Sequence, residues 1–398
     1  MKIAIIGAPE FPDGGAVAHR LFMMARGLAS QGHETYLLVP HKFSPGELRE
    51  DVGGVKLIWG GYGVKTDTET FFHKINKRLL LIKSLFKVLS NGLDWLILYD
   101  LGLDGLPFLL LARKYRCYVA AENCDVRIIL YNSFKDKLIK FWYYIASRHL
   151  SSRYDINFAI TSYIEANLRS LVPNVPTLII PAIIDVEEFH YDQELGRLFR
   201  NKWGIQDDFL ITYTGSLQRI HGLEILLNAG HKLIRSGKRI KIIVCGRFVY
   251  DLRKKEIMKL MDEYQLHDQV VFTGFLSTAE VVAALSAADL LVAPQIDHVA
   301  NLAGFPQKIA EYLAMGKPVV ASASGDIPRY LRDNDNALLC KPGDPESLTR
   351  ALTELLDNPD LRQRLSRRAR ETALQHFDCR VLAGYIESKF LELRQSSG

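Results

Sequence analysis

Short apolar runs alternate with longer amphipathic segments along the whole chain. In the first half, helical periodicity is found near residues 16–31 and 72–90, and the apolar runs around these segments read KIAIIGA, TYLLV, DWLILY, CYVAA and INFAI. Strands that alternate with helices of this length are typical of βαβ units and a parallel sheet. Ser162 and Glu165 have the spacing of a capping box, which predicts a helix that starts after INFAI with Ser162 as its cap.

The same alternation begins again in the second half. Helices are expected near 221–236, 251–265 and 306–315, and the apolar runs that predict strands read FLITYTG, IKIIVCG, VVFTG, DLLVAP, PVVAS and LLCKPGD. The segment between the halves, residues 183–205, is polar and has no predicted strand, which suits a linker between two packed units. A length of 398 residues also favours two domains, at roughly 150 residues each. We therefore expect two doubly wound α/β domains, 1–185 and 186–376, followed by a last amphipathic helix, 377–398.

The composition narrows the class of protein. Apolar residues make up 48% of the chain and charged residues 24%, as in globular proteins, and the net charge of +5 is too modest to predict a nucleic-acid binder. Five scattered cysteines without a C-x-x-C pair indicate reduced thiols rather than disulfides or a zinc site. The first residues predict a strand rather than a signal peptide, and no apolar run approaches about 18 residues. The modest positive charge favours an anionic partner, and a nucleotide, a phosphate and an acidic lipid headgroup all remain open. The reduced cysteines favour a cytoplasmic location.

Two glycine-bearing loops follow predicted first strands. Gly14 and Gly15 end the loop GAPEFPDGG, where a missing side chain lets backbone N–H groups approach an anion. The loop lacks the G-x-G-x-x-G fingerprint, which argues against a dinucleotide site, and an ordinary turn would use the same glycines. The loop 215–222 carries Ser216, Arg219 and His221 in the ligand crevice of an open α/β sheet. It could hold a diphosphate, although a solvated histidine before a glycine is an equally simple interpretation.

Residues 301–321 carry the strongest signal. Pro306 fits the first turn of a helix that ends at Gly316, so the helix dipole would favour a phosphate near residues 304–307. Lys308 and Glu311 share one helix face, where the ammonium suits phosphate and the carboxylate suits two ribose hydroxyls. The alternative is a surface ion pair worth a few tenths of a kcal/mol.

Three stretches together resemble the family-4 retaining glycosyltransferases of the GT-B fold. They are EYLAMGKPVVAS, GSLQRIHGLE and the segment from ITSYIEANL to IIPAIIDVEEF, and with the Gly14–Gly15 pair near the N-terminus the likeness covers nearly the whole chain. The resemblance implies two Rossmann-like domains facing each other across a cleft, with the last helix packed back on the first domain. It further implies that Glu311 holds the donor ribose and that Gly15 and Gly215 approach the donor phosphates.

The chain departs from the family pattern at three positions. Ala303 stands where the family has its first motif glutamate, and Ser216 and His221 replace an arginine and a lysine of the phosphate loop. Lys308, in FPQKIAE, resembles a subgroup that reads P-x-K-x-x-E, and its charge can replace the missing lysine. The remaining donor-binding candidates are Arg219, Arg247, Phe275, Gly304 and Phe305. In the first domain Glu122 and Asp125 resemble an E-x-x-D variant that contacts the acceptor or the reacting sugar.

The resemblance implies a retaining transfer from a nucleotide-sugar donor to a hydroxyl of a glycan or lipid-linked acceptor. No Asp-x-Asp pair stands at a predicted strand end, so we expect no metal or other cofactor, with Lys308 and His221 meeting the leaving diphosphate. The alternatives are a non-catalytic protein of the same fold and another cleft enzyme, such as a sugar-nucleotide epimerase or an NAD-dependent oxidoreductase. Residues 71–89 and 134–150 are basic and amphipathic, as in helices that dock on anionic membranes, although helices that cover a sheet also show this pattern.

Overall fold

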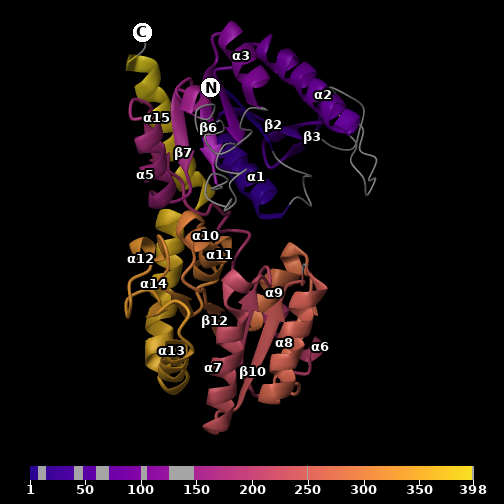
Figure 1. Cartoon of the computed structure of the whole chain (residues 1–398), viewed down its shortest axis with the longest axis vertical. Coiled ribbons are helices and arrows are strands. Elements are labelled where there is room, and N and C mark those ends of the chain that lie inside the picture. The colour runs from indigo at the N-terminus through magenta and orange to yellow at the C-terminus, as the bar shows by residue number, and fades with distance from the viewer. Residues whose placement is uncertain are drawn as a thin grey trace, which may run out of the picture. The chain divides into compact units, whose positions relative to one another are not determined.

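The chain folds into two compact units in a computed structural model that describes residues 1–7, 15–39, 48–59, 71–99, 105–124, 148–248 and 250–396. Unit 1 comprises Met1–Ile183 and Cys379–Gly398, and unit 2 comprises Ile184–Asp378 (Figure 1). The boundaries lie two residues from those that the sequence pattern suggested. No helix in the described part of the chain is long and apolar enough to cross a membrane.

Unit 1 is built on an eight-stranded sheet in which only the edge strand β3 is antiparallel to its neighbour. In spatial order the strands are β3 (Leu48–Val52), β4 (Val55–Trp59), β2 (Glu34–Val39), β1 (Lys2–Ile6), β5 (Trp95–Tyr99), β6 (Tyr118–Asn123), β7 (Ile156–Ala159) and β8 (Thr177–Ile179). The order reverses direction between β1 and β5. A methyl group on Gly7, just after β1, would lie 2.7 Å from Tyr99 Cβ, so these two strand ends approach closely.

Helices cover both faces of this sheet because successive side chains of a strand point to opposite sides. Ile3 and Ile5 face α1 (Gly15–Ser30) and the C-terminal helix α15 (Cys379–Ser396), whereas Ala4 and Ile6 face α2 (Phe71–Leu89) and α3 (Leu106–Lys114). The ring of Phe390 on α15 stacks on Trp95 at 3.7 Å between centroids. The last helix is therefore an integral part of the unit 1 core. The short helix α5 (Ser162–Leu171) follows β7.

Unit 2 is built on a six-stranded, fully parallel sheet. Its spatial order is β11 (Val270–Gly274), β10 (Ile240–Cys245), β9 (Phe209–Thr214), β12 (Leu290–Ala293), β13 (Val319–Ser322) and β14 (Leu338–Cys340). This is the 3-2-1-4-5-6 order of a doubly wound sheet, whose direction reverses between β9 and β12. The predicted fold class, two doubly wound parallel-sheet domains, is confirmed.

The helices of unit 2 form two layers over its sheet. One core cluster joins the sheet to α7 (Leu223–Arg235), α8 (Asp251–Tyr264), α13 (Pro345–Asp357) and the start of α14 (Pro359–His376). A second cluster joins the opposite face to α6 (Gln193–Lys202) and α9 (Thr278–Ala287). Three shorter helices lie near the carboxyl ends of the strands: α10 (Val299–Ala303), α11 (Gln307–Ala314) and α12 (Ile327–Tyr330).

Three local predictions need correction. The predicted linker 183–205 contains α6, which is capped by Asp192 and buries Phe199, so most of it is packed structure within unit 2. The cap of α5 is Thr161, whose hydroxyl accepts from Ile164 N at 3.3 Å, and Glu165 instead pairs with Arg169. Strands β3 and β4 were not among the predicted elements: LREDV in β3 alternates weakly, whereas VKLIW in β4 has the apolar residues of a strand. All five cysteines are free thiols.

Candidate functional site

The candidate site of unit 2 lies where β9 and β12 end side by side. The loop after β9 runs from Gly215 to Gly222, and a methyl group on Gly222 would lie 3.0 Å from the carbonyl oxygen of Pro294, which follows β12. Ile296 N donates to Ile220 O at 3.3 Å, which ties the two loops together. In an open α/β sheet this reversal point is where ligands bind.

Helix α11 brings Lys308 against the first of these loops. The Lys308 ammonium lies 3.9 Å from the centroid of the Tyr213 ring, and a methyl group on Gly215 would lie 3.1 Å from Nζ. Gly215 has φ of +115°, a conformation that glycine adopts without strain. The position therefore has to be glycine both for its backbone conformation and for the approach of the lysine.

Contacts of Tyr312 fix α11 to β9, and a hydrogen bond of Tyr213 fixes the loop that follows β9. Tyr312 Oη accepts from Thr214 N at 2.7 Å and lies 3.0 Å from Thr214 Oγ1, while Tyr213 Oη donates to Ser216 O at 2.8 Å. Both tyrosine rings are fully buried. The backbone that presents Lys308 and the loop that faces it thus form one rigid arrangement.

Lys308 and Glu311 are half-buried, and neither forms a hydrogen bond or an ion pair within the described residues. Burial lowers the pKa of Lys308 to about 7, opposed by the charge of Glu311. Burial likewise raises the pKa of Glu311 to about 7, opposed by Lys308 and increased by Glu188. The two charges influence one another without direct contact, which removes the surface ion pair as an explanation for their spacing.

His221 and Ser216 add polar atoms to the same loop. Burial, together with the positive charge of Lys308, lowers the pKa of His221 to about 4. His221 is therefore neutral at pH 7 in the unliganded unit, and the expectation that it supplies a standing positive charge is corrected to that of a neutral hydrogen-bonding group. His221 Nδ1 and Ser216 Oγ are buried atoms without a hydrogen-bond partner among the described residues.

The remaining predicted donor-site residues are dispersed around this loop. Arg219 is held by Glu256 at 2.7 Å, and Arg247 lies 5.9 Å from the ring of Phe275, which is 77% exposed. Gly304 and Phe305 precede α11, but the Phe305 ring is buried against Tyr330 and Phe377. Phe305 thus serves packing rather than a ligand surface. Ala303 is also buried, at the end of α10.

The structure describes two of the three site residues that were predicted in unit 1. Gly15 is exposed, has φ of +68° and starts α1, with open space where a side chain would lie. Glu122 is fully buried, where Oε1 accepts from Arg20 Nε and Cys124 Sγ, each at 2.9 Å. Arg20 and Cys124 thus occupy one carboxylate oxygen, whereas Glu122 Oε2 is a buried atom without a hydrogen-bond partner among the described residues. Asp125 lies outside the described residues.

Asn301 is a contributor that sequence spacing did not reveal. Its amide nitrogen donates to Ile220 O and Ile296 O, both at 2.9 Å, and its oxygen accepts from Gln295 Nε2 at 3.3 Å. It thereby holds the carbonyl immediately before His221. Because the contact joins positions 81 residues apart, a single sequence carries no signal for it.

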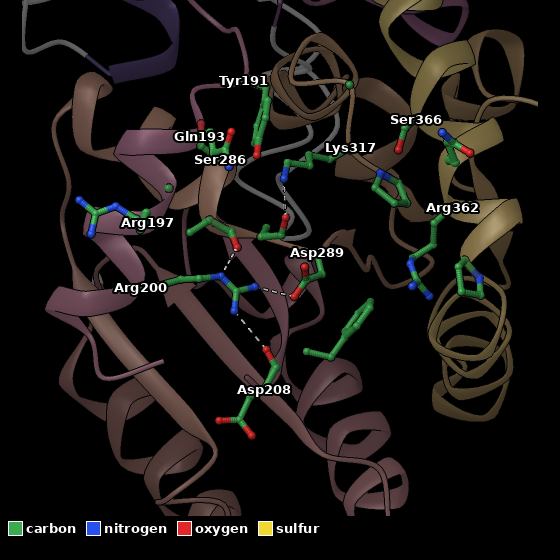
Figure 2. Close-up of a pocket in the computed structure, with 18 of the residues that line it drawn as sticks. Tyr191, Gln193, Arg197, Arg200, Asp208, Ser286, Asp289, Lys317, Arg362 and Ser366 are labelled. Carbon is green, nitrogen blue, oxygen red and sulfur yellow. Dashed lines mark hydrogen bonds and ion pairs between the residues drawn. The ribbon is translucent and has the colours of Figure 1, made fainter. Parts of the chain in front are cut away.

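A polar groove of about 910 Å³ lies at the opposite, amino edge of the same sheet. Figure 2 shows that Arg200 and Lys317 are bonded within the groove: Arg200 donates to Asp289 at 2.6 Å and to Asp208 O at 3.2 Å, and Lys317 donates to Ala288 O at 2.8 Å. Arg200 also donates to Ala287 O at 2.9 Å, which binds α6 to the end of α9. The groove is therefore explained by the attachment of α6 and does not compete with the loop at Gly215 as a ligand site.

Residues 197–372 match the family described as Glycosyl transferases group 1. The match lies within unit 2 and includes the loop at Gly215 and helix α11. Among curated relatives, the chain is 25% identical over 170 residues to an alpha-D-kanosaminyltransferase of Streptomyces kanamyceticus, covering 43% of this chain and 42% of that protein. The alignment thus spans less than half the length of that relative.

Solved structures resemble the whole chain. Sucrose-phosphate synthase from Thermosynechococcus elongatus has a TM-score of 0.75 at 18% identity, with 99% of each chain covered. HepE from Anabaena, in complex with UDP and glucose, has a TM-score of 0.74 at 15% identity, with 98% of this chain and all of that chain covered. At these identities the likeness establishes the shared GT-B fold.

Proposed function

Because residues 197–372 belong to the glycosyl transferases group 1, we propose that the chain transfers a sugar from a nucleotide-sugar donor to a hydroxyl of a glycan or lipid-linked acceptor. The observation that carries the proposal is the arrangement at the β9 loop. Lys308 and Glu311 are half-buried charges without a bonded partner in the described residues, and two further unpaired polar atoms lie in the facing loop. Unsatisfied groups of this kind are costly unless a ligand completes them.

A nucleoside diphosphate has the chemistry that these groups lack. Its phosphates would take the Lys308 ammonium and hydrogen bonds from Ser216 Oγ and His221, and the uncapped start of α11 adds its dipole. Its ribose would offer two hydroxyls to the Glu311 carboxylate one turn further along the helix. A UDP complex of a structurally similar protein is consistent with this class of donor.

The proposed chemistry needs no residue that attacks the sugar. In a retaining transfer, the donor bond breaks toward the diphosphate while the acceptor hydroxyl approaches from the same face and gives its proton to a phosphate oxygen. Lys308 and the loop hydrogen bonds would stabilise the charge that develops on the leaving group. We expect this to proceed without a divalent metal, which turnover in the presence of EDTA would test, and to yield the donor's anomeric configuration, which NMR of the product would test.

A thermal-shift screen against UDP, GDP, ADP, dTDP and CMP tests the donor site. A nucleotide present at about 100 times its Kd stabilises by about 2.7 kcal/mol, or about 5–10 °C in a unit of this size. We expect one nucleotide base to give a selective shift that disappears in Glu311→Ala and persists in Glu354→Ala, a matched change at an exposed site on α13. If no nucleotide shifts the wild-type protein, the donor assignment is wrong.

The same preparation separates the proposed enzyme from its alternatives. A non-catalytic protein of this fold would bind the nucleotide but release no free nucleoside diphosphate when given its sugar conjugate. An NAD-dependent enzyme would respond to nicotinamide dinucleotides instead. Slow hydrolysis of the sugar conjugate, lost in Lys308→Met, favours a transferase.

A further inference from the structure

Helices α2 and α3 of unit 1 carry apolar side chains on the side that faces water. Toward the sheet, α2 buries Leu81, Leu85 and Val88. On its other side Leu79 is 51% and Phe86 is 49% exposed, and on α3 Leu110 is 53% exposed. A helix that only covers a sheet usually carries polar residues on its outer side. The outer sides of these two helices therefore have the composition of a contact surface.

These exposed residues lie on two neighbouring helices. Leu79, Lys83 and Phe86 follow one another at four- and three-residue spacing, which places them on one side of α2, and Leu110 and Lys114 share a side of α3 in the same way. The Phe86 ring meets the Tyr115 ring edge-on at 5.8 Å, which joins the two helices. We call Leu79, Lys83, Phe86, Leu110, Lys114 and Tyr115 the outer α2–α3 surface.

The charge of these helices has a single sign. The 19 residues of α2 include five lysines or arginines and no acidic residue, and the nine residues of α3 end in Arg113 and Lys114, again without an acidic residue. Helix α8 of unit 2 can be compared with α2 and α3, because Tyr250 and Leu252 at its start are also exposed. There the neighbouring charges are mixed, because Asp251 and Glu256 accompany Lys254 and Lys255.

We propose that the outer α2–α3 surface docks onto an anionic lipid bilayer. Leu79, Phe86 and Leu110 would enter the headgroup region, and Lys83 and Lys114 would lie at the level of the lipid phosphates. Basic helices with exposed leucine and phenylalanine bind bilayers by burying apolar area and by attraction to anionic lipids together. A bilayer needs no complementary pocket, and this surface is a row of separate side chains on two helices. Charge complementarity with a uniformly negative partner is what singles out the bilayer.

The inference is independent of the donor site. It concerns only unit 1, and neither nucleotide nor acceptor takes part in the contact. Its consequence for the proposed transferase is that the first unit would be held where lipid-linked acceptors are found. A failure of donor binding would leave the docking proposal standing, and the reverse also holds.

Vesicle co-sedimentation of the full-length chain tests the proposal. The probes are phosphatidylcholine vesicles with and without 30% phosphatidylglycerol, at low and at moderate salt. We expect binding only to the anionic vesicles, weakening as salt screens the charges. Lys83→Glu with Lys114→Glu should bind at least about thirtyfold more weakly, because losing each lysine near an anionic surface costs about fivefold and each new glutamate adds repulsion. Lys254→Glu with Lys255→Glu, which changes the net charge equally on α8, should bind like the wild type.

A second variant separates docking from simple charge attraction. Leu79→Ser with Phe86→Ser keeps every charge and changes two half-exposed side chains, so the fold, followed by its thermal midpoint, should persist while vesicle binding drops. Wild-type protein that ignores anionic vesicles overturns the proposal. Equal loss of binding in the α8 control also overturns it. A concentration-dependent dimer in sedimentation velocity that Phe86→Ser abolishes would overturn it as well, since a second copy of the chain would then cover the surface.

Discussion

The two units each place a cation beside a glutamate near the carboxyl ends of their strands, and the two pairs differ in whether the charges are in contact. In unit 1, Arg20 and Glu122 are buried and in contact, and Arg20 Nη2 also donates to Ile180 O at 2.7 Å. In unit 2, Lys308 and Glu311 are half-buried and unbonded within the described residues, and the pKa values of both are moved toward 7.

This difference distinguishes an ion pair that stabilises the fold from a pair of charges that is available to a ligand. A buried ion pair in direct contact holds α1 to β6 and to the carbonyls of Ile180 and Pro181, although Glu122 Oε2 has no hydrogen-bond partner among the described residues. A pair left incomplete beside a glycine loop costs free energy that a ligand can return. Whether the two charges of a pair are in contact is therefore more informative than the residue types, because both pairs contain the same kinds of charged group.

The largest effect on stability is expected from breaking the contact between Arg20 and Glu122. Arg20→Met leaves Glu122 buried without its partner, which should destabilise unit 1 by about 3–5 kcal/mol. Urea unfolding followed by the fluorescence of Trp95 would measure this change. Removing both charges, in Arg20→Met with Glu122→Leu, should recover most of the loss. Arg113→Met breaks a half-exposed pair with Asp155 and should cost about 1 kcal/mol or less.

The incomplete pair should respond in ligand binding rather than in stability. Lys308→Met removes the ammonium that we expect to meet the diphosphate, and its affinity for a nucleoside diphosphate should fall about 10- to 100-fold, as for the loss of a charged hydrogen bond. Calorimetry would measure this. Arg219→Met is the matched control, because Arg219 is already engaged by Glu256. An equal loss in both variants would show that only the summed charge matters.

The pH dependence of binding sharpens the same comparison. Lys308 has a pKa of about 7 in the free unit, and a bound diphosphate would raise it, so binding takes up a proton above pH 7. Affinity for a nucleotide sugar should therefore fall up to about tenfold per pH unit above 7. Titrations in buffers of different ionisation enthalpy would detect the proton. A pH-independent affinity for the wild type, matching that of Lys308→Met, contradicts this mechanism.

The smallest effect concerns stability without ligand. The folded-state pKa of Lys308 is below its ordinary value of 10.5, so its charged form is disfavoured by folding: the cost is complete below about pH 7 and disappears as pH rises toward 10.5. Lys308→Met should raise the melting temperature at pH 6 by about 2–4 °C, equivalent to about 1 kcal/mol, and by less at pH 9. Lys259→Met, at an exposed site on α8, should change neither value.

Much of the fold could be predicted from the pattern of apolar residues, because strands buried on both faces and helices with one apolar side leave clear periodicities. The hairpin strands β3 and β4 were not predicted. An edge strand such as β3 needs little apolar surface, whereas β4 lies inside the sheet and buries Val55 and Leu57, so its apolar pattern was available in the sequence. The segment 183–205 was interpreted as a linker because it is polar, yet α6 needs only Phe199 and Gly196 to pack against α9. A methyl group on Gly196 would lie 2.9 Å from the Ser286 carbonyl carbon, a close approach that no pattern indicates.

The features of the candidate site likewise fall into those that the sequence determined and those that the tertiary structure determined. The chain by itself determined which groups are present: glycines after the first strand of each half, and Lys308 with Glu311 on one side of a helix. Only the tertiary structure decided their state, because pairing, burial and pKa depend on residues far apart in the sequence. It joined Glu122 to Arg20 across 102 positions in a buried ion pair, turned the Phe305 ring into the core, and left Lys308 and Glu311 beside the loop at Gly215 without a hydrogen bond or ion pair among the described residues.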